Sequence, residues 1–291
     1  MAIDYTERSI VAPDGVRLYL RDYGALHGAA SGTIFCLHGL TRNSADFESV
    51  ALYLAELGWR VLAMDVRGRG RSERDPDPSR YRPDVYTRDV LHILDALNIK
   101  EAVFVGTSMG GLITMVLAAS APARIKAAIL NDVGPVVNPA GLARIAGYVG
   151  NVGPYESWEA FTAAIRTAQA VAFPDADQQF WQSVARRVGR KRSDGRIVFD
   201  YDPAIAQALA QPAGAVPVDL QALFAALSEK PILVVRGELS DILAPEGVDV
   251  MRKLNAQLIA VEVPRVGHAP SLDEPVAREA IRSFLQSLPQ S

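Results

Sequence analysis

Short apolar segments typical of buried β-strands alternate along this chain with segments of helical periodicity. Residues 33–39 (TIFCLHG) are almost wholly apolar, as expected for a strand buried on both faces. Residues 46–58 then repeat apolar side chains at helical intervals, and residues 59–68 again indicate a strand. Because such units build parallel sheets with helices on both faces, the sequence predicts an α/β fold with a mostly parallel central sheet.

The same alternation covers most of the remaining chain. Further strands are predicted at 101–108, 125–133, 230–241 and 256–264, and further helices at 84–98, 109–121, 245–255 and 274–288. Residues 9–23 indicate two short strands instead, because Asp14-Gly15 is a hairpin-turn signal between them.

The alternation stops between about residues 134 and 228. This segment contains helix-like patterns and several aromatic side chains, but no buried parallel strand. We therefore predict an α/β core of residues 1–133 and 229–291, interrupted by a helical cap at 134–228. An insertion at the carboxyl edge of the strands usually covers or shapes a ligand site.

Composition narrows the expected partners and compartment. The chain has 291 residues, of which 49% are hydrophobic and 22% charged, and its formal net charge is −3. These values indicate a soluble globular protein and argue against nucleic acid or an anionic membrane as a partner. The amino-terminal segment resembles neither a secretory signal nor a membrane anchor, and a single cysteine, Cys36, fits a reducing compartment. We expect a cytoplasmic protein.

Ser108 lies between two glycines where a predicted strand becomes a predicted helix. The segment Gly106-Thr107-Ser108-Met109-Gly110 matches G-x-S-x-G, the motif of a nucleophilic serine held in a strained bend above a sheet. Side chains at positions 106 and 110 would clash in such a bend, which accounts for the glycines. An ordinary tight turn is the alternative interpretation, but the strand-to-helix position favours catalysis.

A serine hydroxyl needs a base to become a good nucleophile, and the chain has four histidines. His268 and His38 both follow predicted strands, at the edge where Ser108 lies. We predict His268 as the base, because its loop joins a strand to a helix and can lean over the sheet. His38 is expected to order its own loop, His27 to lie in an exposed loop and His92 on a helix surface.

The base in turn needs a carboxylate that fixes its tautomer. Asp241 follows the predicted strand at 230–241, and Asp132 has the same placement one strand earlier. We predict Asp241 as the partner of His268 and keep Asp132 as the competing candidate. Two main-chain N–H groups are predicted to bind the oxyanion: that of Met109, at the start of a helix, and that of Leu40, in the loop after residues 33–39.

With these residues placed, the chain resembles the α/β-hydrolase superfamily over nearly its whole length. The resemblance rests on motifs in the family's order: LHG at 37–39, DVRGRGRS at 65–72, GTSMGG at 106–111, SD at 240–241 and GH at 267–268. The order nucleophile, acid, base is also the family's. The resemblance implies an α/β-hydrolase fold with a helical cap and a catalytic Ser108, Asp241 and His268. It further implies supporting roles for His38, Gly39, Gly106 and Gly110, and no cofactor or metal.

The predicted function is hydrolysis of carboxylic esters through an acyl-enzyme, with a small ester or related carbonyl compound as substrate. Serine at position 108 argues against haloalkane dehalogenases and epoxide hydrolases of this fold, which carry aspartate there. The alternatives are a lactonase, a carbon–carbon bond hydrolase of the meta-cleavage type, or a small-molecule receptor on a hydrolase fold. The C–C alternative is weakened because the loop at 38–47 lacks the glycines usual in that group.

We expect a monomer or a homodimer. The arginines of the predicted cap are interpreted more simply as a solvated helix face than as ligands of a substrate carboxylate. They include Arg144, Arg166, Arg186, Arg187, Arg190 and Arg192.

Overall fold

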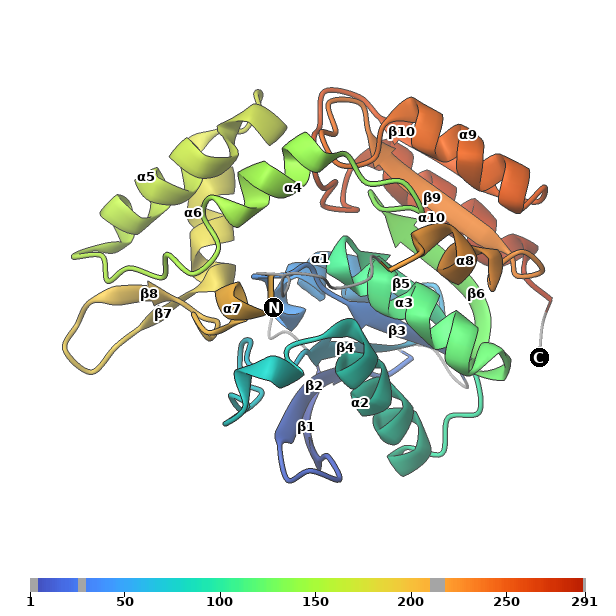
Figure 1. Cartoon of the computed structure of the whole chain (residues 1–291), viewed down its shortest axis with the longest axis horizontal. Helices are drawn as coiled ribbons and strands as arrows, with labels where there is room; N and C mark the ends of the chain where they lie inside the picture. Colours follow the sequence, from blue (N-terminus) through green and yellow to red (C-terminus); the bar gives the residue numbers. More distant parts are fainter. Residues whose placement is uncertain (1–4, 26–29, 210–217, 290–291) are drawn as a thin grey trace.

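The core of the protein is a twisted, mostly parallel β-sheet (Figure 1). The computed structural model describes residues 5–25, 30–209 and 218–289. Within them the sheet has eight strands in the order β1-β2-β4-β3-β5-β6-β9-β10. Their bounds are β1 Thr6–Val11, β2 Arg17–Tyr23, β3 Thr33–Leu37, β4 Arg60–Asp65, β5 Ala102–Thr107, β6 Ile125–Asn131, β9 Ile232–Gly237 and β10 Ile259–Val263. β1 and β2 form the predicted hairpin and β2 is antiparallel to β4, whereas every other pair is parallel. The predicted α/β fold is confirmed.

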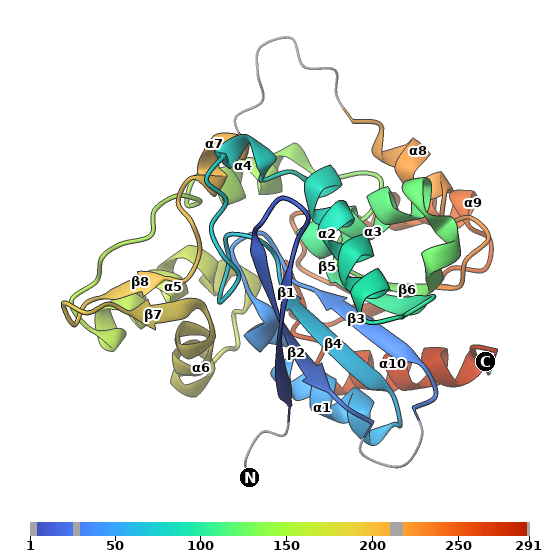
Figure 2. The same ribbon diagram turned by 90° about the horizontal axis from the view of Figure 1, so that it is seen from below.

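Helices cover both faces of this sheet. One face carries α1 (Glu48–Glu56) and α10 (Pro275–Ser287), and the other carries α2 (Pro83–Ala96), α3 (Met109–Ser120) and α9 (Pro245–Leu254) (Figure 2). Successive side chains of a strand enter different cores: Phe35 packs with α2 and α3, and Ile34 packs with α1 and α10. Both faces of β3 are therefore buried under helices, which explains its near-continuous apolar run.

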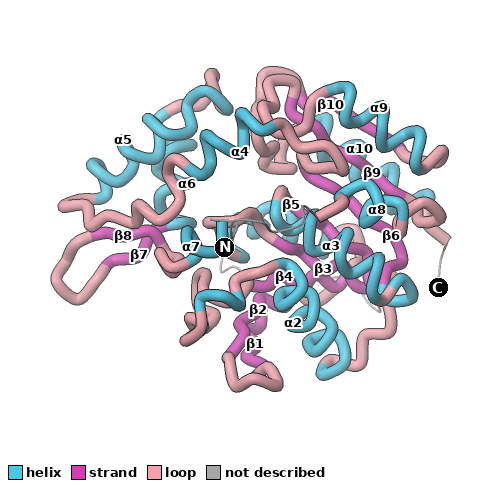
Figure 3. The backbone as a smooth tube through the Cα atoms, viewed as in Figure 1, coloured by secondary structure: helices cyan, strands magenta, loops and turns pink. Residues whose placement is uncertain are grey.

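The segment between β6 and β9 is mainly helical, as predicted, but it also contains a short hairpin (Figure 3). Its elements are α4 Pro139–Ala146, α5 Trp158–Gln169, α6 Gln178–Val188, β7 Gly189–Lys191, β8 Ile197–Phe199, α7 Ile205–Leu209 and α8 Leu220–Ala225. α5, α6 and the hairpin enclose a small core of their own, in which Phe161 and Trp181 are buried. α8 packs on α3 and α9 instead, so the end of the predicted cap lies against the main core.

Main-chain hydrogen bonds hold this segment against the loops at the carboxyl edge of the sheet. The N–H of Gly70 donates to the carbonyl of Asp200 at 2.9 Å, and the N–H of Asp202 donates to Gly68 at 2.7 Å. The loop after β10 is joined similarly, through the N–H of Gly267 and the carbonyl of Ala172 at 2.6 Å. The inserted segment is thus fixed over the edge where Ser108 lies.

Cys36 is fully buried in β3, and burial raises the pKa of its thiol well above the usual range. In the described ranges, no helix combines the length and the apolar character needed to cross a membrane.

Candidate active site

Ser108 occupies the sharp turn between β5 and α3. Its backbone angles, φ 52° and ψ −112°, lie in a region that residues other than glycine rarely adopt. A Cβ atom at Gly106 would lie 2.6 Å from the main chain of Gly110, and one at Gly110 would lie 2.0 Å from the carbonyl oxygen of Leu37. Only glycine fits at both positions, and the bend that they permit exposes the Ser108 hydroxyl at the strand ends.

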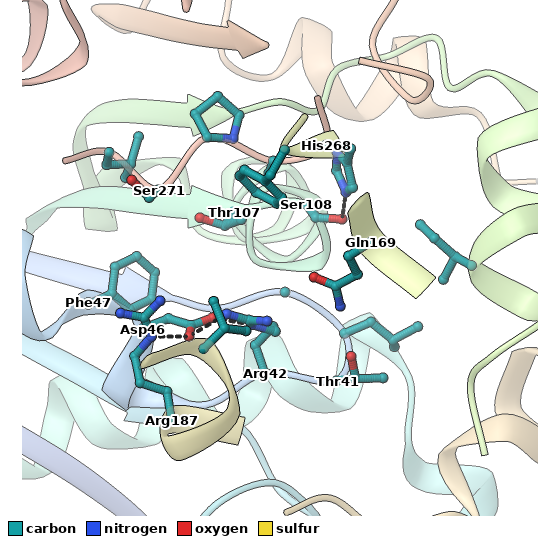
Figure 4. A pocket seen from close by; sticks show the side chains of 18 of the residues that line it. Thr41, Arg42, Asp46, Phe47, Thr107, Ser108, Gln169, Arg187, His268 and Ser271 are labelled. Atoms are coloured by element: carbon teal, nitrogen blue, oxygen red, sulfur yellow. Dashed lines mark hydrogen bonds and ion pairs between the residues drawn. The ribbon is translucent and has the colours of Figure 1, made fainter. Parts of the chain in front are cut away.

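The imidazole of His268 connects Ser108 with an acid. Figure 4 shows its hydrogen bond to Ser108. Its Nε2 lies 2.9 Å from Ser108 Oγ, and its Nδ1 lies 2.8 Å from Asp132 Oδ2. The side chain of His268 is 9% exposed and that of Asp132 is fully buried. The carboxyl group of Asp132 accepts a hydrogen bond from the Nδ1–H group, which leaves Nε2 able to accept the proton of the serine hydroxyl.

His92 does not take part in this arrangement. His92, on α2, lies with Nε2 2.9 Å from the carbonyl oxygen of Val11. His27 falls outside the described residues.

The predicted pairing of Asp241 with His268 is wrong. Asp241 turns toward α4, where Arg144 donates to both of its carboxylate oxygens at 2.5 and 2.8 Å. The residue before it, Ser240, points inward instead, and its hydroxyl donates to Asp132 Oδ2 at 2.5 Å. The turn after β9 therefore supplies a hydroxyl that supports the acid, and not the acid itself.

Asp132 reaches His268 because of its backbone conformation and its neighbours. It follows β6, which lies between β5 and β9, and its φ of 56° is one that aspartate tolerates better than most residues. The N–H of Gly237 donates to its Oδ1 at 3.0 Å. Three hydrogen bonds, from Gly237, Ser240 and His268, therefore hold the buried carboxyl group in place.

Asn131 is a further residue of the site that the sequence analysis did not identify. It ends β6, and its side-chain amide donates to the carbonyl of Pro270 at 2.8 Å, which holds the loop that carries His268. A polar residue beside Asp132 in "ILND" was the available signal. Ser240 belongs to the SD motif at 240–241, but its role could not be assigned from the sequence because it depends on how the turn after β9 folds.

His38 orders the loop after β3, as expected. Its Nδ1 donates to the carbonyl of Gly39 at 2.7 Å, while Nε2 accepts the N–H of Val66 at 3.0 Å. The ring is fully buried, and burial lowers the pKa of His38 to about 4. The carbonyl of Gly39 also accepts the N–H of Arg42 at 3.1 Å. In a trans peptide the next N–H, that of Leu40, points away from this carbonyl and is equally fixed.

The two predicted oxyanion donors belong to segments that both border Ser108. Gly39 is close enough that a Cβ atom there would lie 3.9 Å from Ser108 Cβ, and Met109 is the first residue of α3. The first N–H groups of a helix lack intrahelical partners and lie at its positive end. The buried Arg69 connects the segments, since it donates to the carbonyl of Leu40 at 2.9 Å and lies 3.5 Å from Met109 Sδ.

A cavity of about 120 Å³ opens beside Ser108 and His268. Its wall from the inserted segment is mainly apolar and includes Tyr148, Phe173, Phe180 and Val184. Arg144 and Arg187 also line it, whereas Arg166, Arg186, Arg190 and Arg192 are exposed and do not. The interpretation as a solvated face therefore holds for Arg166, Arg186, Arg190 and Arg192 only. Among the described residues, no group of three His, Cys, Asp or Glu side chains is arranged to hold a metal.

Comparisons with known proteins agree with this architecture. Residues 32–275 match the model of the alpha/beta hydrolase fold family. The chain is 34% identical over 273 residues to a 3-hydroxybutyrate-oligomer hydrolase of Cupriavidus necator, which covers 91% of this chain and 92% of the relative. It is 26% identical over 253 residues to a 2-(acetamidomethylene)succinate hydrolase of Mesorhizobium japonicum, with 86% of each chain covered.

A solved structure gives the same result. An alpha/beta hydrolase from Novosphingobium aromaticivorans superposes with a TM-score of 0.91 at 44% identity, covering 98% of this chain and 99% of that one. The chain therefore belongs to the α/β-hydrolase family and is a hydrolase.

Proposed function

We propose that this protein hydrolyses carboxylic esters through an acyl-enzyme, with Ser108 as nucleophile, His268 as general base and acid, and Asp132 as the carboxylate that orients His268. The observation that carries the proposal is the continuous hydrogen-bonded series from Ser108 Oγ through His268 to Asp132. A serine on this turn, paired with a base that a buried acid holds, has the geometry that nucleophilic acyl transfer requires.

The reaction follows from these positions. His268 Nε2 takes the hydroxyl proton as Ser108 Oγ adds to the ester carbonyl carbon. The N–H groups of Leu40 and Met109 stabilise the oxyanion, and losing one such donor commonly lowers kcat by about 10²- to 10³-fold. Collapse of the intermediate breaks the bond to the alkoxy oxygen, which receives the proton from His268. Water then gives a proton to His268 as its oxygen adds to the acyl carbon. Collapse of this second intermediate breaks the bond to Ser108 Oγ, which takes the proton back from His268, and the acid is released.

Short esters of hydroxy acids are the substrate class that we propose. The relative from Cupriavidus necator hydrolyses 3-hydroxybutyrate oligomers, whose units are joined by ester bonds, and it matches this chain over nearly its full length. The cavity is small, and its wall from the inserted segment is mainly apolar, which favours a short acyl group.

Ester hydrolysis and mass spectrometry test the proposal together. Wild-type protein should hydrolyse p-nitrophenyl acetate, p-nitrophenyl butyrate and the linear 3-hydroxybutyrate dimer. Ser108→Ala should lower kcat by at least roughly 10⁴-fold. Acid quenching during turnover should trap an acyl group on Ser108.

Three results would contradict the proposal. Ester turnover that survives in Ser108→Ala would show that Ser108 is not the nucleophile. A wild-type protein that is inert to esters but cleaves a vinylogous diketone would be a carbon–carbon bond hydrolase. Tight binding of esters without turnover would indicate a receptor.

A further inference from the structure

Two arginines of the cavity wall face a single carboxylate. Arg42, in the loop after β3, donates through Nε and Nη2 to both oxygens of Asp46. Arg187, near the end of α6, approaches the same Asp46 with Nε 3.5 Å from Oδ1, without a hydrogen bond. Figure 4 shows Asp46 between the two guanidinium groups, on the other side of the cavity from Ser108 and His268. Two positive charges thus share one negative charge.

Arg187 is the less satisfied of the pair. Its Nε is buried and has no hydrogen-bond partner among the described residues, and its Nη1 reaches only the hydroxyl of Ser183 at 3.3 Å. Burial is the main cause of a lowered pKa at Arg187, whereas the close carboxylate raises the pKa of Arg42 despite burial. The Nε group of Arg187 has therefore lost water without gaining a hydrogen-bond partner among the described residues, while the side chain as a whole stays partly exposed.

Neighbouring acids do not supply the missing charge. Glu48 and Asp273 are near enough to affect the pKa of Arg187, but Glu48 binds Arg21 and Asp273 binds Arg278. Arg144, the other cavity arginine from the inserted segment, is matched by Asp241. An excess positive charge remains at Arg187.

The main chain at Arg187 is fixed to the core. The amide of Asn43 donates to the carbonyl of Arg187 at 2.8 Å, and the N–H of Asp200 donates to that of Val188 at 2.8 Å. The end of α6 therefore has a set position above the loop after β3. A guanidinium held there by its backbone, and short of one anion, is suited to bind a carboxylate.

We propose that Arg187 binds a free carboxylate of the substrate, so that the preferred esters carry an acid group as well as the ester that meets Ser108. This inference rests on the proposed ester hydrolysis and specifies its substrate class. The carboxylate accepts from the guanidinium of Arg187 where it lines the cavity, and Asp46 remains with Arg42. A charge-assisted bond of this kind corresponds to a preference of about 10- to 100-fold over an uncharged analogue.

Matched pairs of substrates test the proposal. Monoethyl esters of succinate, glutarate and adipate are compared with the corresponding ester amides, which have nearly the same shape and no charge, and ethanol release gives kcat/KM. Wild-type protein should favour the acid by at least about 10-fold for one chain length. Arg187→Met should reduce this ratio to near 1 by raising KM for the acid, with kcat/KM for the amide changed less than about 3-fold.

Arg166→Met is the matched control, because Arg166 is an exposed arginine of the same inserted segment that does not line the cavity. This variant should keep the wild-type preference. Equal turnover of acid and amide by the wild-type protein, or a preference that survives in Arg187→Met, would overturn the carboxylate subsite and leave ester hydrolysis intact.

A binding measurement separates this proposal from the proposed function. Calorimetry on Ser108→Ala should show binding of the monoethyl ester that wild-type protein hydrolyses best. If no ester is turned over, the dianions of succinate, glutarate and adipate are used as ligands instead. The double variant Ser108→Ala/Arg187→Met should bind at least about 10-fold more weakly. Equal affinity in the two proteins would contradict the subsite whether or not esters are substrates.

Discussion

The stability of this protein should fall in mild acid because of His38. The ring is fully buried, donates through Nδ1 and accepts through Nε2, and burial lowers its pKa to about 4. Above pH 6.5 the ring is neutral in both the folded and the unfolded chain. As the pH falls from 6.5 to about 4, the unfolded chain binds a proton that the folded protein excludes, so the free energy of unfolding decreases.

The size of this effect follows from the two pKa values, 6.5 when exposed and about 4 when folded. The loss is about 2 kcal/mol between pH 7 and pH 5, and it reaches about 3 kcal/mol once the pH is below 4. A protonated His38 could no longer accept the N–H of Val66, and that lost bond is the structural form of the same penalty.

Urea unfolding of wild-type protein and of His38→Gln, at pH 7 and at pH 5, measures how much the free energy of unfolding changes with pH. The variant is expected to be less stable at both pH values, because it loses hydrogen bonds of the buried ring. Its stability should change less with pH, by about 2 kcal/mol. Equal losses between pH 7 and pH 5 in the two proteins would refute the reasoning.

Three further predictions concern the turn of Ser108, the support of the acid and the inserted segment. Gly110→Ala should lower Tm and esterase activity, because its Cβ would lie 2.0 Å from a main-chain oxygen, whereas Gly24→Ala meets no atom within 4 Å and should do neither. Ser240→Ala should lower kcat by about 10-fold without a matching change in KM, since it removes one hydrogen bond to Asp132. Trp181→Ala should destabilise the core of α5 and α6 by about 3 to 5 kcal/mol in urea unfolding.

The inner part of the sheet could be predicted because β3, β4, β5, β6 and β9 are buried on both faces. Each inner strand is a short apolar run between helical segments, and this pattern survives without knowledge of the tertiary structure. The hairpin β7-β8 could not be found in the same way. Its strands, Gly189–Lys191 and Ile197–Phe199, have three residues each and are too short for alternation to appear.

The acid shows where the reasoning from sequence stops. Asp132 and Asp241 both follow inner strands, so strand position alone does not separate them. What separates them is local: Asp132 adopts a left-handed backbone conformation that aims its carboxyl inward, and Arg144 of α4 binds Asp241 outside the site. Neither fact is encoded in a short sequence pattern.

The arginines that line the cavity could not be identified from the sequence either. Arg186 and Arg187 are adjacent in the sequence, yet only Arg187 lines the cavity. Which of them faces the core depends on how α6 packs over the loop that carries Arg42 and Asp46.

In the proposed mechanism Asp132, and not Asp241, orients His268 for proton transfer from Ser108. The most direct test is kcat for hydrolysis of p-nitrophenyl butyrate by Asp132→Asn and Asp241→Asn, each checked for unchanged folding by circular dichroism. Asp132→Asn should lower kcat by about 10³- to 10⁴-fold, as loss of the orienting carboxylate does in serine triads, and Asp241→Asn by less than about 10-fold. A large loss in Asp241→Asn with a nearly active Asp132→Asn would contradict the account.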